Sequence, residues 1–183
     1  MRTGAFLKTA LSDFRHAGTL FPSSQAVSDE IGRTLGGDRR FVVEYGAGDG
    51  AVTSEILRNI PEDGKLLALE INAEFSDALD GLGDPRLSVK RQDVVNFLLN
   101  GVIDLPRIDA VVSGIPLSFL EPPTRDAVIR RTKEILAPGG LLVIYQASPF
   151  FFPRVQTHFP KAKMHLSLRN LLPPYFIAVA RKD

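Results

Sequence analysis

Short apolar runs alternate with helix-like apolar patterns along most of this chain. Runs typical of buried strands cover residues 41–44, 65–71, 86–91, 108–112 and 141–146. Between these runs, apolar residues recur with a helical period at residues 52–60, 73–79, 94–99 and 123–136. Strands separated by helices of this length predict an α/β fold, in which a parallel sheet carries helices on both faces.

The pattern changes after residue 146. Residues 150–158 fit either a helix or a loop, and strand-like segments follow at 161–168 and 175–181. We expect these last two segments to form an antiparallel pair at the end of the sheet, which gives seven strands in total. The chain is predicted to be a single domain over residues 1–183, because its length suits one α/β core.

Two helices are predicted before the first strand, at residues 1–15 and 25–35, so that N-terminal helices occupy residues 1–36 and the core 37–183. The first of them has an apolar side and a basic, hydroxyl-rich side. One interpretation is an ordinary packing helix. The other is an interfacial helix that places Phe and Leu in a membrane surface and its basic residues near lipid phosphates.

Composition narrows the possible functions. The net charge of +1 gives no global electrostatic reason to expect a nucleic-acid partner. The absence of Cys excludes disulfides, thiolate catalysis and Cys-based zinc sites, and the three His show no metal-ligand spacing, so no metal is expected. No apolar run approaches the roughly 20 residues that span a bilayer.

The loop after the first core strand carries the clearest chemical signal. It reads Glu-Tyr-Gly-Ala-Gly-Asp-Gly over residues 44–50, with a glycine at every second position from Gly46. Glycine allows unusual backbone angles in a tight turn and lets a ligand approach the main chain. A strand, this turn and a helix together predict a loop that binds a nucleotide-type ligand.

Two ligands fit the glycine spacing. Residues 46–51 match the dinucleotide fingerprint G-x-G-x-x-A, and residues 44–50 match E-x-G-x-G-x-G, the loop of Rossmann-like methyltransferases that bind S-adenosylmethionine. Charge favours the second, because a pyrophosphate disfavours nearby carboxylates such as Glu44 and Asp49. S-adenosylmethionine has no phosphate and carries an ammonium and a sulfonium.

Two further acids follow predicted strands, where ligands bind in open α/β sheets. Glu70 ends the second strand and could accept both ribose hydroxyls, although it could instead be a solvated acid at a helix start. Asp93 follows the third strand and could accept from the adenine amino group, a role that is compatible with capping the next helix.

The fourth strand leads into a loop suited to the methyl acceptor. Ser113, Gly114, Ile115 and Pro116 resemble the Asn-Pro-Pro-Tyr loops of amine-directed methyltransferases, although a proline-shaped turn is an alternative. Main-chain carbonyls there could hold a neutral amine. Possible proton acceptors or relays elsewhere are Tyr45, Tyr145, Tyr175 and His165, each of which could also be an ordinary core or surface residue.

These motifs together resemble the bacterial phospholipid N-methyltransferase family, the soluble type that converts phosphatidylethanolamine to phosphatidylcholine. The resemblance covers nearly the whole chain and includes Gly-Thr-Leu-Phe-Pro-Ser-Ser at 18–24. It implies a Rossmann-like class I methyltransferase with a mostly parallel seven-stranded sheet. It also implies stepwise methylation of a lipid amine, S-adenosylhomocysteine as product, and peripheral attachment to the cytoplasmic face of the membrane through the N-terminal helix.

Ribosomal RNA adenine dimethylases share part of this pattern, so a ribosomal RNA or small-molecule amine remains an alternative acceptor, and we expect a monomer. The resulting cofactor-binding set is Thr19, Ser24, Glu44, Gly46, Gly48, Gly50, Glu70, Ile71, Asp93, Val94 and Ser113. The acceptor and proton-transfer set is Ser113, Gly114, Ile115, Tyr45, Tyr145 and Tyr175.

Overall fold

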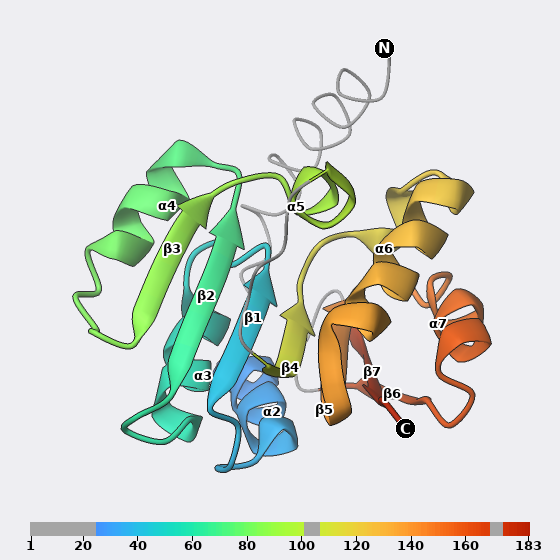
Figure 1. The fold of residues 1–183 in the computed structure, drawn as a ribbon, viewed down its shortest axis with the longest axis horizontal. Coiled ribbons are helices and arrows are strands. Elements are labelled where there is room, and N and C mark those ends of the chain that lie inside the picture. The colour runs from blue at the N-terminus through green and yellow to red at the C-terminus, as the bar shows by residue number, and fades with distance from the viewer. Residues whose placement is uncertain (1–24, 101–106, 169–173) are drawn as a thin grey trace.

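A seven-stranded sheet with the order β3-β2-β1-β4-β5-β7-β6 forms the centre of the fold (Figure 1). The computed structural model describes residues 25–100, 107–168 and 174–183. Neighbouring strands are parallel from β3 to β5, and β7 is antiparallel to both β5 and β6. The strands are β1 (Phe41–Tyr45), β2 (Lys65–Glu70), β3 (Leu87–Arg91), β4 (Ile108–Ser113), β5 (Leu136–Gln146), β6 (Lys163–Ser167) and β7 (Tyr175–Arg181). The prediction of a mostly parallel seven-stranded sheet with a C-terminal antiparallel pair is confirmed.

Helices cover both faces of this sheet, as the alternation of patterns predicted. One face packs against α2 (Gln25–Leu35), α3 (Ala51–Asn59) and α4 (Ala73–Asp80). The other face packs against α5 (Val94–Asn100), α6 (Pro122–Ile135) and α7 (Phe152–His158). A short 3₁₀ turn, η1 (Leu117–Phe119), joins β4 to α6. The sheet core is therefore buried on both sides, which explains the almost continuous apolar runs of β4 and β5.

β5 begins earlier than the sequence indicated. The expected start at residue 141 is wrong, because Leu136 already pairs with Ile108 and the register then shifts so that Leu141 faces Ala110. The extra residues include Pro138 and Gly139, whose φ of 75° is left-handed. These residues resemble a loop in sequence, but in the structure they form an irregularity within the strand.

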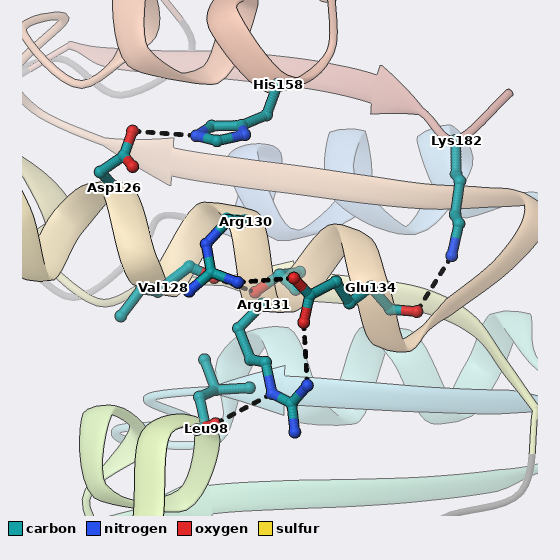
Figure 2. Close-up of polar contacts among 9 residues, drawn as sticks. Leu98, Asp126, Val128, Arg130, Arg131, Glu134, His158 and Lys182 are labelled. Carbon is teal, nitrogen blue, oxygen red and sulfur yellow. Dashed lines mark hydrogen bonds and ion pairs between the residues drawn. The ribbon is translucent and has the colours of Figure 1, made fainter.

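The helix α6 is fastened to its neighbours by polar contacts on its outer side (Figure 2). Glu134 accepts from Arg130 at 2.6 Å and Arg131 at 2.8 Å, and Arg131 also reaches the Leu98 carbonyl of α5 at 3.3 Å. Asp126 lies 2.9 Å from His158 of α7. Individually such exposed pairs stabilise by less than about 1 kcal/mol. Two of these contacts join α6 to its neighbours: Arg131 reaches α5 at Leu98, and Asp126 reaches α7 at His158.

The N-terminal helix predicted at residues 1–15, and the predicted cofactor residues Thr19 and Ser24, lie outside the described residues. Within the parts of the chain that the structure describes, no helix has both the length and the apolar character needed to cross a membrane.

Candidate active site at the carboxyl ends of the strands

The glycine loop turns from β1 into α3 with left-handed angles at each of its glycines: φ is 73° at Gly46, 55° at Gly48 and 82° at Gly50. A β-carbon at Gly46 would lie 2.9 Å from Ile115, and one at Gly50 would lie 2.9 Å from Leu79. At Gly48 it would meet nothing within 4 Å. The outer two glycines therefore serve close packing, while Gly48 borders open space that a ligand can occupy.

Glu70, at the end of β2, holds this loop in place. One carboxylate oxygen accepts the Gly48 N–H at 2.9 Å, and the other accepts the Asn72 N–H at 2.7 Å. The side chain is buried, yet a carboxylate has about four acceptor positions, so about two remain for a ligand. The position suits the predicted contact with ribose hydroxyls, which stays a prediction.

Glu44 is fully buried at the end of β1, beneath the glycine loop. Its Oε2 accepts from the Thr53 hydroxyl at 2.7 Å, whereas its Oε1 has no hydrogen-bond partner among the described residues. Burial raises the pKa of Glu44 to about 7, with smaller contributions from the Glu70 and Asp49 carboxylates and opposition from the Thr53 hydrogen bond. An incompletely satisfied buried carboxyl of this kind fits a cationic ligand and disfavours a phosphate.

Asp93 and its neighbours occupy the adjacent strand ends. Its Oδ1 accepts the Asn96 N–H at 2.7 Å, so the carboxylate caps α5, one of the two roles considered from the sequence. Val94 is buried in the core, whereas Ile71 is 41% exposed at the end of β2. Ile71 is thus available to cover a ligand at this edge, whereas the side chain of Val94 is not.

In the loop after β4, one backbone carbonyl accepts no hydrogen bond from the described residues. Gly114 donates its N–H to the Tyr45 carbonyl at 2.9 Å. The carbonyls of Ile115 and Pro116 accept the N–H groups of Leu117 and Phe119, at 2.8 and 3.0 Å. The Gly114 carbonyl accepts no hydrogen bond from any backbone or side-chain group of the described residues. Among the described residues, the Gly114 carbonyl thus keeps both of its acceptor positions, whereas the Ile115 and Pro116 carbonyls keep one each.

The side chains of Tyr45 and Ser113 point into the core beneath α6. The Tyr45 hydroxyl lies 3.3 Å from that of Thr132, and burial raises its pKa above the usual range. The Ser113 hydroxyl is buried without a partner among the described residues and lines a small internal cavity with Tyr45 and Leu117. Both hydroxyls are therefore buried in the core, and the roles predicted from the sequence, proton transfer for Tyr45 and orientation of the acceptor for Ser113, stay predictions.

Tyr145 lies on the face of the sheet that packs against α2 and α3, opposite to the face that Tyr45 occupies, and its side chain approaches the loop after β4. Its hydroxyl lies 2.4 Å from where a β-carbon on Gly114 would be, and its ring centre is 6.1 Å from that of Tyr175. Burial, reinforced by Glu44, raises the pKa of Tyr145 well above its usual range. The phenol therefore stays protonated at neutral pH, and its close approach to Gly114 shapes this loop, while its predicted part in proton transfer stays a prediction. His165 instead pairs with Glu30 of α2, at 2.6 Å.

Two polar residues of this region escaped the sequence analysis. Thr53 holds Glu44, and Gln146 ends β5, where its amide nitrogen donates to the Ser118 hydroxyl at 2.9 Å and the Ser148 carbonyl at 3.0 Å. The available signal for Gln146 was a polar residue closing an otherwise apolar strand. The described residues contain no group of acidic or histidine side chains that could hold a metal ion.

A glycine loop with open space at Gly48, a partly satisfied buried acid and an adjacent acceptor loop define a Rossmann-like methyltransferase site, and these residues fit S-adenosylmethionine. Residues 42–140 match the model of the methyltransferase domain family, and the chain belongs to that family. The protein is thus an S-adenosylmethionine-dependent methyltransferase.

Relatives with known names support this family and differ in their acceptors. The chain is 31% identical over 175 residues to an ornithine lipid N-methyltransferase from Singulisphaera acidiphila, covering 87% of this chain and 88% of that protein. It is 29% identical over 141 residues to a putative O-methyltransferase from Mycolicibacterium smegmatis, covering 72% of this chain and 61% of that one.

Solved structures support the fold. The N-methyltransferase NodS from Bradyrhizobium japonicum, in complex with S-adenosylhomocysteine, superposes with a TM-score of 0.68 at 16% identity, over 84% of this chain and 85% of that one.

Proposed function

We propose that this protein methylates the amine of a membrane lipid, and that phosphatidylethanolamine is converted stepwise to phosphatidylcholine. The observation that carries the proposal is the likeness to an ornithine lipid N-methyltransferase, which extends over 87% of the chain and so beyond the methyltransferase core. The Gly114 carbonyl, which accepts no hydrogen bond from the described residues, agrees with an amine acceptor.

The residues of the chain have separate tasks in this proposal. S-adenosylmethionine, when bound, supplies a methyl group on a sulfonium, which makes the methyl carbon electrophilic. Glu44 and Glu70 hold the cationic donor, and the loop at 114–116 aligns the acceptor nitrogen. Alignment and exclusion of water are what such a displacement mainly requires. An ammonium with a pKa of roughly 10 must first lose a proton, and we assign this proton to solvent, because the buried phenols stay protonated.

We further propose that the enzyme works as a monomer attached peripherally to the cytoplasmic face of the membrane. The apolar side of the segment at residues 1–15 supports attachment. Phe119 and Phe150 add to this support, because they are 62% and 78% exposed in the loops that follow β4 and β5. Phe151, next to Phe150 in the chain, is buried in the core and does not add to this surface.

Vesicles of defined composition test the acceptor. Purified protein and methyl-labelled S-adenosylmethionine are incubated with vesicles of phosphatidylethanolamine, of ornithine lipid, or of phosphatidylcholine alone. Label should enter phosphatidylethanolamine, with monomethyl, dimethyl and trimethyl products appearing in turn. Label in ornithine lipid alone would show that the acceptor is a lipid amine with a different head group from the one proposed. Label only in ribosomal RNA, a water-soluble amine or a hydroxyl compound would contradict the proposal.

A further inference from the structure

Gln146, at the end of β5, lies beside the loop at 114–116 that we propose to hold the acceptor nitrogen. Ser113 at the end of β4 pairs with Ile144 of β5, so Gln146 extends two residues further, level with the loop at 114–116. Its amide is also bonded to Ser118 of η1, in the same connection. The side chain is only 6% exposed, so its polar atoms need partners within the protein or from a ligand.

The orientation of this carboxamide is fixed by the Ser148 carbonyl. A carbonyl can only accept, so the group that lies 3.0 Å from it must be the amide nitrogen of Gln146. The amide oxygen, Oε1, therefore points elsewhere, and it is buried without a hydrogen-bond partner among the described residues. A buried acceptor that lacks a donor is unfavourable, and a ligand with an N–H removes the defect.

We propose that Gln146 is a positioning residue whose amide oxygen accepts an N–H of the acceptor amine, which rests on the lipid-amine function proposed above. A neutral primary amine has two N–H groups and one lone pair. With one N–H on the Gly114 carbonyl and the other on Gln146 Oε1, the lone pair is left to face the methyl donor. Neither acceptor needs to change its protonation state.

This arrangement makes the contribution of Gln146 depend on the methylation state of the acceptor. Counted from the ammonium form of the acceptor, each transfer replaces one N–H by an N–CH₃ and releases one proton to water before the neutral amine attacks the methyl group. An unmethylated amine can donate to both oxygens, and an N,N-dimethylated amine can donate to neither. Gln146 should therefore assist the first transfer most and the third transfer least.

Gln146→Met, which keeps the length of the side chain and removes its polar atoms, tests this dependence. We expect kcat/KM for phosphatidylethanolamine to fall about 10-fold, the effect of losing one hydrogen bond to the reacting group. The same variant should change kcat/KM for N,N-dimethyl-phosphatidylethanolamine by less than about 3-fold. S-adenosylhomocysteine affinity should be unchanged. Gln156→Met, at an exposed position of α7, is the matched control.

Gln146→Glu supplies a rescue. A buried, protonated glutamic acid can donate its O–H to the Ser148 carbonyl and leave its other oxygen for the amine, so it reproduces the pattern of glutamine. Its activity on phosphatidylethanolamine, divided by that of the wild type at the same pH, should rise as the pH falls. If Gln146→Met lowers kcat/KM equally for both lipids, or for neither, the proposed role of Gln146 is overturned. A wild-type protein that methylates no amine would instead overturn the proposed function.

Discussion

Two buried carboxylates at the ends of β1 and β2 meet different environments although they lie within one site. Glu70 accepts two backbone N–H groups, which satisfy its charge. Glu44 accepts one hydroxyl and has an unpartnered oxygen within the described structure, so its charged form is poorly supported until a cation arrives. The two residues should therefore respond differently to substitution.

Removal of Glu70 should weaken cofactor binding. In Glu70→Ala the N–H groups of Gly48 and Asn72 lose their acceptor, so the glycine loop is no longer held against β2. Hydrogen bonds to charged groups contribute about 1.5–3 kcal/mol, which predicts a loss of roughly 10- to 100-fold in S-adenosylhomocysteine affinity. Titration calorimetry measures it, with Glu62→Ala, at an exposed position, as control. An unchanged affinity in a folded Glu70→Ala protein would remove Glu70 from the site.

Glu44 should make the ligand-free protein less stable as the pH rises. Its pKa of about 7 in the folded state exceeds the ordinary 4.5, so between these values the folded state keeps a proton that the unfolded state has lost. The free energy of unfolding therefore falls over this interval, and the penalty is complete above the upper value. Burial opposes the ionisation of Glu44 most, the Glu70 and Asp49 carboxylates add to this opposition, and the Thr53 hydrogen bond reduces it.

Glu44→Gln removes this penalty. At about pH 8 the variant without ligand should be more stable than the wild type by up to about 3 kcal/mol, and the difference should vanish near pH 4.5. Urea unfolding at several pH values measures it, with Glu62→Gln as control. For the same reason, wild-type affinity for S-adenosylmethionine should increase as the pH rises past 7, whereas Glu44→Gln should lose this dependence. A parallel pH response in both proteins would contradict the assignment.

At this scale the sequence predicted the acids and missed the orientations. Glu44, Glu70 and the glycines follow from a local motif whose spacing is set by the ligand. The inward turn of Tyr45 could have been anticipated, since successive strand residues point to opposite faces and Glu44 occupies the other face. The unpartnered oxygen of Gln146 could not, because it depends on contacts with Ser118 and Ser148 that no sequence pattern encodes.

At the scale of elements, the connection from β4 through η1 to α6 carries the acceptor site that we propose. Its path is set by the close approach of Tyr145 to Gly114, where glycine is required by space, since its φ is not in the left-handed region. The Pro-Gly-Gly segment at the start of β5 was left out of the predicted strand. It resembled a loop because proline and glycine break strands. In the structure, β5 pairs with β4 at Leu136, before this segment, and with both β4 and β7 from Leu141, after it, so the irregularity lies within one strand.

Gly114→Ala should disturb the acceptor loop. The new β-carbon would lie 2.4 Å from the Tyr145 hydroxyl and 2.8 Å from the adjoining ring carbon, so the loop or the buried ring must shift. We expect a loss of about 1–3 kcal/mol in stability, typical of overpacking. A displaced acceptor should also lower kcat/KM by about 10- to 100-fold, with a smaller change in cofactor affinity.

Tyr145→Phe should relieve part of this clash, because it removes the nearer atom. The double variant should therefore recover some of the activity that Gly114→Ala loses. Gly37→Ala is a suitable control, because its new β-carbon would meet only an ordinary contact at 3.8 Å. Full activity in Gly114→Ala would show that the position of this loop is unimportant for the acceptor.

At the scale of the whole molecule, the order of strands places cofactor and acceptor side by side. β1 lies between β2 and β4, so the chain switches direction across the sheet at the glycine loop, which is where open α/β sheets bind ligands. The alternation of strands and helices predicted the parallel sheet, because parallel strands require crossover helices, but it did not predict the order of the strands. The acceptor is less predictable, since related proteins that share the layout are named as N- or O-methyltransferases.

The central proposal for this protein is that its acceptor amine belongs to a membrane lipid. The direct measurement compares methyl transfer to phosphatidylethanolamine vesicles with transfer to glycerophosphoethanolamine, the same head group without acyl chains, at equal amine concentration. If the acceptor is a membrane lipid, mass spectrometry should detect methylated products of the intact lipid and little transfer to the deacylated compound. Equal rates on both, or transfer to the deacylated head group alone, would contradict it.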